Sequence, residues 1–151
     1  MMLVKALHVL AAVLWVGGMF FAYVVLRPSS VATLEPPARL GLWAAVLSRF
    51  FTWVWGAIAV LLASGYWMIF ALGGMKAVGM HVHLMHGLGL VMVLLFAHVY
   101  FAPFKRLGRA VEAQDWPQGA KQLNIVRLIV AANLVIGVII VLVASGRGFG
   151  L

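Results

Sequence analysis

Residues 80–107 read MHVHLMHGLGLVMVLLFAHVYFAPFKRL and hold four of the five histidines of the chain in one otherwise apolar run. The run is long enough to cross a bilayer, because a transmembrane helix needs roughly 20 apolar residues. Ionisable side chains in such a segment are costly and usually face a bundle interior, where they bind a ligand or carry protons. His81, His83 and His86 crowd the first turns, and His98 lies about 18 Å further along the helix. The pattern therefore predicts a site at the crowded end.

The composition of the chain indicates its class. Of the 151 residues, 66% are hydrophobic and 9% are charged, and the mean hydropathy is +1.12. A soluble domain carries about 25% charged residues, so we predict a membrane protein embedded in the lipid bilayer. A chain of this length has room for one bundle, and we expect a single transmembrane domain over residues 1–151. Because cysteine is absent, a soft metal would have to be held by histidine or methionine.

Three further uncharged runs join the histidine-rich one, and the four together predict an all-α fold, an integral membrane four-helix bundle with short loops. The predicted spans cover approximately residues 3–26, 50–73, 81–104 and 124–146. Residues 28–49 are interpreted as a turn and then a helix that begins at the interface, since Pro36 suits a helix start. Asp115 is interpreted as the cap of the last helix. We therefore expect interfacial helical extensions.

The basic residues lie mostly on one side of the predicted bundle. Eight border the first and third loops, namely Arg27, Arg39, Arg49, Lys105, Arg106, Arg109, Lys121 and Arg127, and only Lys5, Lys76 and Arg147 lie on the other side. By the positive-inside rule these two loops are cytoplasmic and both termini are periplasmic, in a multi-pass protein of the bacterial inner membrane. The net charge of +8 does not indicate a nucleic-acid partner, because the basic residues form no patch with interleaved aromatics.

The fifth histidine lies in the first span. His8 is about two turns from the predicted periplasmic face, and His83 or His86 comes one to two turns into the third span, so the depths agree within roughly 5 Å. Trp15 and Gly18 follow His8 along the same helical face. Small residues there permit close approach of a helix or a flat ligand, so we include Trp15 and Gly18 among the predicted cofactor contacts.

Two imidazoles from facing helices at one depth suit the axial positions of a b-type haem held in a bundle. We predict His8 and His83 as the metal ligands. His86 lies about 60° from His83 on the same broad face, so it is an alternative ligand or a propionate contact. His81 points about 160° away from His83 and is expected to meet water or headgroups. Without a cofactor, the same histidines would form an interhelical polar network.

The first and third spans also contain short motifs, Lys5-Ala-Leu-His8, Trp15-Val-Gly17-Gly18 and His81-Val-His83. In these motifs the chain resembles the CopD-like membrane proteins, which include copper-resistance protein D and, more distantly, the HemJ-type protoporphyrinogen oxidases. The HemJ-type resemblance implies that His8 ligates haem b, although His83 stands where that family has an essential lysine. The copper-resistance resemblance implies copper uptake or tolerance, for which His81, His83 and His86 with Met80 and Met85 are suitable ligands.

The sequence thus favours a protein that binds haem b and has an electron-transfer or oxidoreductase role, with a redox partner protein. No catalytic residue is assigned. The alternative is a copper uptake or resistance protein that binds copper through His and Met, and then His98 would be a second polar station toward the cytoplasm. A third class is a structural subunit in which the histidines only pack. We expect a homo-oligomer, and we expect Asn133 to form an interhelical hydrogen bond.

Overall fold

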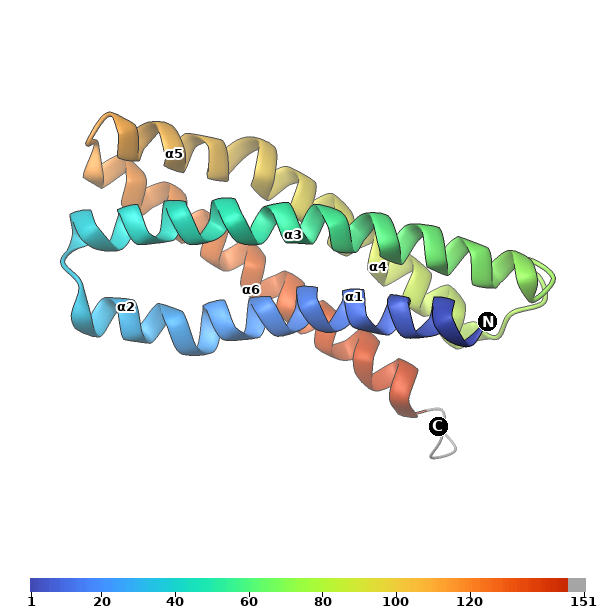
Figure 1. Ribbon diagram of the computed structural model, residues 1–151. Helices are drawn as coiled ribbons and strands as arrows, with labels where there is room; N and C mark the ends of the chain where they lie inside the picture. The colour runs from blue at the N-terminus through green and yellow to red at the C-terminus, as the bar shows by residue number, and fades with distance from the viewer. Residues whose placement is uncertain (147–151) are drawn as a thin grey trace.

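Four long helical segments make up the part of the chain that the computed structural model describes, residues 1–146 (Figure 1). The first consists of α1 (Met2–Phe20), η1 (Phe21–Leu26) and α2 (Arg27–Thr33), and the second is α3 (Pro36–Ala71). The third consists of α4 (Met80–Val99), η2 (Tyr100–Phe104) and α5 (Lys105–Glu112), and the fourth is α6 (Trp116–Gly146). Residues 1–146 contain no strand, so the prediction of an all-α four-helix fold is confirmed. Arg147 and the predicted periplasmic C-terminus lie outside the described residues.

Each of the four segments is long and apolar enough to cross a membrane. Their lengths of 32, 36, 33 and 31 residues correspond to about 46–54 Å, whereas the hydrocarbon core is about 30 Å thick. The helices therefore continue past the apolar runs, as in α2 and α5. The second helix ends at Ala71, before the predicted residue 73, because Gly73 and Gly74 have φ values of 98° and 87° that a helix does not permit.

Two short π-helical turns interrupt the α-helices, and each accompanies a proline. Pro103 lies inside η2, and Pro28 follows η1 by two residues. A proline in a helix lacks an N–H group and its ring clashes with the carbonyl four residues earlier. A local π turn relieves this conflict while the helix continues. Both long segments therefore remain continuous despite their prolines.

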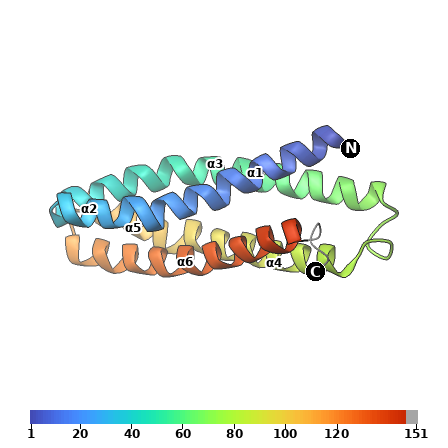
Figure 2. The ribbon, with the colours of Figure 1, turned by 90° about the horizontal axis from the view of Figure 1, so that it is seen from below.

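The helices form two layers, which Figure 2 shows from below. α1 packs mainly on α3, and α4 packs mainly on α6, with the α5 extension also against α6 (Figure 2). Aromatic side chains join the layers: Phe51 of α3 meets Phe96 of α4 edge-on at 5.1 Å between ring centroids, and Trp15 of α1 meets Phe96 at 6.1 Å. All three rings are buried. The core is therefore built around the middle of the bundle.

The two ends of the bundle carry different side chains. The connections at residues 34–35 and 113–115 lie together at one end, and the N-terminus and the loop 72–79 lie at the other (Figure 1). We call the first the arginine end, after Arg27, Arg39 and Arg127, and the second the histidine end, after His8, His81, His83 and His86. At the arginine end the Gln118 N–H donates to Asp115 Oδ1 at 3.2 Å, so the predicted cap of the last helix is confirmed.

Candidate metal-binding site at the histidine end

His8 is attached to α3 by a hydrogen bond that the sequence did not predict. Its Nδ1 lies 2.7 Å from Oγ of Ser64, a residue 56 positions away in the chain. Ser64 is buried, with 7% of its surface exposed, and His8 is half-buried. The helix leaves room for the imidazole at Gly65, where a Cβ atom would lie 3.4 Å from His8 Cε1. α1 and α3 are therefore joined by a polar contact near the histidine end.

The direction of this hydrogen bond follows from the other partner of Ser64. Its hydroxyl also lies within hydrogen-bond distance of the Val60 carbonyl, one turn earlier in α3. A serine hydroxyl has one hydrogen, and a carbonyl oxygen can only accept. Ser64 therefore donates to Val60 and accepts from His8 Nδ1–H. In the neutral imidazole this leaves the lone pair on Nε2, and a histidine that binds a metal through one nitrogen commonly donates from the other to a second residue.

Three of the four α4 histidines, His81, His83 and His86, lie at the same end of the bundle. His86 is half-buried, and its ring meets the ring of Tyr66 edge-on at 5.3 Å between centroids. Ser64 and Tyr66 are two residues apart on α3, about 3 Å along the axis. His8 and His86 therefore meet α3 at nearly the same level along its axis but on different sides of it, because residues two apart in a helix are about 200° apart. His83 is exposed, whereas His81 is half-buried and lies over Gly79 at the start of α4.

Trp15 and Gly18, the other predicted cofactor contacts, pack within the protein. Trp15 is 4% exposed and meets Phe96 edge-on. A Cβ atom added at Gly18 would overlap the ring of Phe50, so this glycine gives α3 close access to α1. We expected a small residue here to admit either a helix or a flat ligand, and Gly18 admits a helix.

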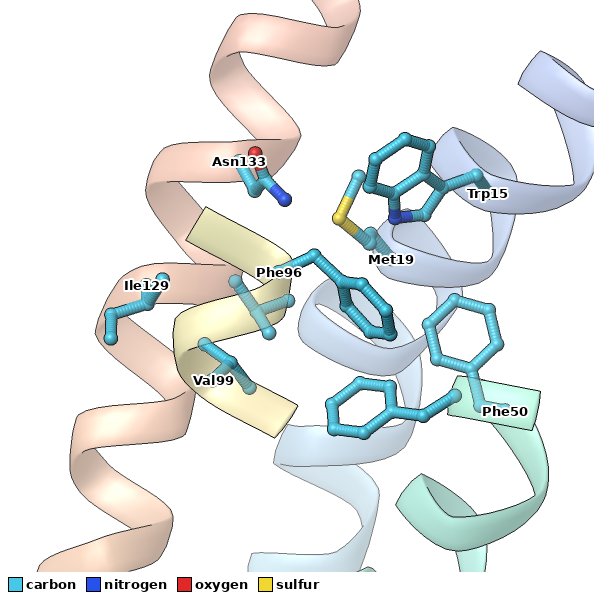
Figure 3. Close-up of a pocket in the computed structure, with 9 residues that line it drawn as sticks. Trp15, Met19, Phe50, Phe96, Val99, Ile129 and Asn133 are labelled. Carbon is cyan, nitrogen blue, oxygen red and sulfur yellow. The ribbon is translucent and has the colours of Figure 1, made fainter. Parts of the chain in front are cut away.

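Asn133 of α6 occupies the middle of the bundle. Its Nδ2 donates to the Met92 carbonyl of α4 at 3.2 Å, which confirms the predicted interhelical hydrogen bond. Its Oδ1 is buried without a protein partner, and Figure 3 shows the amide beside Met19 and Trp15 at a cavity of about 10 Å³. His98, in contrast, is exposed on the surface of α4. An amide thus occupies the middle of the bundle, whereas His98 faces outward.

The donor atoms at the histidine end are imidazole nitrogens and thioether sulfurs. Within residues 1–146, no group of three or more His, Cys, Asp or Glu side chains is arranged to hold a metal ion. Half-buried Met85 and exposed Met80 lie on α4 among its histidines. Imidazole and thioether are ligands that suit copper, and thioether selects the cuprous ion. Imidazole and thioether groups are therefore the ligand types that this end of the protein offers.

Sequence reasoning missed two residues of this region, Ser64 and Tyr66. Ser64 lies in an apolar run that also contains the small residues Gly56, Ala59 and Ala63, so nothing marks it as a polar partner. To pair this hydroxyl with a histidine of the first span, one must know that the two helices face each other. The order of the helices around the bundle decides this, and the sequence does not contain that order.

Comparison with known proteins agrees with this membrane architecture. A family model described as CopD, copper resistance protein D, matches residues 44–147. The match contains Ser64 and all four α4 histidines, whereas His8 precedes it. No curated protein and no solved structure matches the chain significantly. Since the family model covers well over half of the chain, this protein belongs to the CopD family of membrane proteins.

Proposed function

We propose that this chain handles copper in the membrane, and that it binds the ion at the histidine end through histidine and methionine. The family description, copper resistance protein D, supports this function. Haem b binding with an electron-transfer role, the first interpretation of the sequence, gains no support from the family description. The copper alternative is therefore the better-supported function. We also propose, from the distribution of basic residues, that the histidine end is periplasmic in a bacterial inner membrane.

The contact between His8 and Ser64 is the main support for the location of the site. It orients the imidazole, and in the neutral ring it leaves Nε2 as the nitrogen with the lone pair that metal coordination requires. His86 is the proposed partner on α4, because it lies at the level of His8 along α3 and is half-buried beside Tyr66. His83 is one turn nearer the exposed end of α4, so we assign it to the first capture of copper from outside.

A competition assay with cuprous ion tests this proposal. The purified protein is titrated with Cu(I) under reducing conditions against a coloured Cu(I) chelator, and the affinity is read from the chelator spectrum. His8→Ala and His86→Ala should each weaken binding by more than the roughly 10–100-fold loss that a second-shell change produces. His98→Ala is the matched control, because His98 is a histidine of α4 that faces outward.

The outcomes separate the assignments clearly. Loss of binding in both the His8 and the His86 variants, with normal binding in the His98 variant, supports the proposed site. A large loss in His83→Ala with a normal His86→Ala would move the second ligand to His83. Equal affinity in all variants would place copper elsewhere and overturn the proposal.

A further inference from the structure

A groove at the arginine end is unrelated to the histidines. It has a volume of about 250 Å³ and lies between the η1–α2 segment, the first half of α3 and the first half of α6. In Figure 1 this is the end where the 34–35 connection joins α2 to α3. Three arginines line the groove, Arg27, Arg39 and Arg127, and its lining contains no Asp or Glu. The groove is therefore a concentrated positive charge with no counter-ion in its own wall.

The arginines retain donors that the protein does not use. Arg39 donates from Nη2 to the Leu34 carbonyl at 3.1 Å, which orients its guanidinium, but its Nε is buried without a partner. Arg127 Nε is also buried without a partner. Arg27 lies over the Tyr23 ring, with its Cζ 5.2 Å from the centroid. Buried N–H groups are rarely left unpaired, because each costs about 1–3 kcal/mol. Two such groups in one groove point to an acceptor from outside the chain.

Apart from Tyr23 and Asn124, most of the remaining lining of the groove is apolar. Leu40, Trp43 and Leu47 of α3 are buried side chains that form one wall, and Val126 of α6 lies opposite. The indole N–H of Trp43 is already bonded to Ser30 Oγ at 3.2 Å, so this wall offers no further strong donor. An occupant must therefore combine an anionic head that accepts from guanidinium groups with a hydrocarbon portion that covers the apolar wall.

We propose that this groove binds one anionic phospholipid, with its phosphate at Arg39 and Arg127 and an acyl chain against α3. Guanidinium groups match phosphate oxygens in a bidentate geometry. Basic pockets between transmembrane helices on the cytoplasmic side are suited to anionic lipid headgroups, and the positive-inside rule predicts that the arginine end is cytoplasmic. The occupant is a lipid rather than free phosphate because the apolar wall continues directly from the arginines.

Lipid binding by the purified full chain tests the proposal. The protein is exchanged into detergent and titrated with phosphatidylglycerol or with phosphatidylcholine of the same acyl chains, and native mass spectrometry counts the bound lipid. The double variant Arg39→Gln/Arg127→Gln should weaken phosphatidylglycerol binding about thirtyfold, since each basic residue contributes about 1 kcal/mol to anionic lipid binding. The control variant Arg106→Gln/Arg109→Gln removes the same charge from exposed positions on α5 and should bind normally.

Two further arms identify the occupant and guard against misfolding. Arg39→Lys/Arg127→Lys keeps the positive charge but removes the planar guanidinium groups, so phosphatidylglycerol binding should be partly lost. As a test of folding, copper binding should be normal in every groove variant. Inorganic phosphate should displace the lipid from the wild type no more than it does from the control variant at the same concentration. Equal binding of the two lipids by the wild type, unchanged binding in the glutamine variant, or full displacement by phosphate alone would each overturn the proposal.

Discussion

Replacing Ser64 with alanine isolates the role of the His8 contact without touching a proposed copper ligand. The alanine removes the side-chain acceptor of Nδ1–H of His8, Oγ of Ser64 at 2.7 Å in the native protein. The ring is then free to rotate or to change tautomer, and Nε2 no longer carries a fixed lone pair. We expect weaker copper binding in a protein that still folds.

The magnitude follows from two different consequences of the same change. Loss of a residue that orients a metal-binding histidine lowers metal affinity by roughly 10–100-fold, or about 1.4–2.7 kcal/mol. The cost in folding free energy is smaller, because interhelical hydrogen bonds within membranes average about 0.6 kcal/mol. The bond from Ser64 back to Val60 also disfavours the helix slightly, so alanine offsets part of that cost. Affinity should therefore fall more than stability.

The assay combines the Cu(I) competition titration with thermal unfolding of each variant. Ser64→Thr keeps the hydroxyl and should restore most of the affinity, whereas Ser64→Ala should not. Ser48→Ala is the matched control, because Ser48 is an exposed serine at the other end of the same helix. Wild-type affinity in Ser64→Ala, or an equal loss in Ser48→Ala, would refute the reasoning that Ser64 positions His8 for copper.

Three other predictions concern the bundle. Gly18→Val should destabilise the protein by about 1–3 kcal/mol through overpacking against Phe50. Gly17→Val is the control and should unfold near the wild-type temperature, because no atom lies within 4 Å of the added Cβ. Equal unfolding temperatures for the two variants would contradict the packing of Gly18 on Phe50. Asn133→Ala should cost no more than about 1.7 kcal/mol by removing one interhelical hydrogen bond, and a larger loss in denaturation would mean that its amide does more than join α6 to α4. A reporter after Gly108 should be cytoplasmic and a C-terminal reporter periplasmic; the reverse pattern would overturn the orientation.

The helices could be predicted from the sequence because their cause is local. Long apolar runs must satisfy their backbone groups internally in a bilayer, and only helices do so within one segment. The ends were less predictable, because charges at Arg27 or Lys105 limit the membrane-spanning part without stopping the helix. Gly73 and Gly74 did mark a true end, since their positive φ values belong to a turn.

The candidate site was only partly predictable because it depends on which helices pair. Depth along each span predicted that His8 lies at the level of the first α4 histidines, but no pattern in the sequence indicated that Ser64 would contact His8 or that Tyr66 would contact His86. The arginines were interpreted as topology signals alone. The arginines line one groove because α6 lies beside the first and second helical segments. Counting charges along the sequence does not predict that arrangement.

An absorbance spectrum with metal analysis of the purified wild-type protein tests the central claim most directly. The protein should be produced in cells supplied with copper and with a haem precursor, so that either ligand is available. We expect bound copper, no Soret band and no iron above background, and the copper should be lost in His8→Ala. A Soret band with stoichiometric iron and no copper would contradict the account and return His8 to the role of a haem ligand.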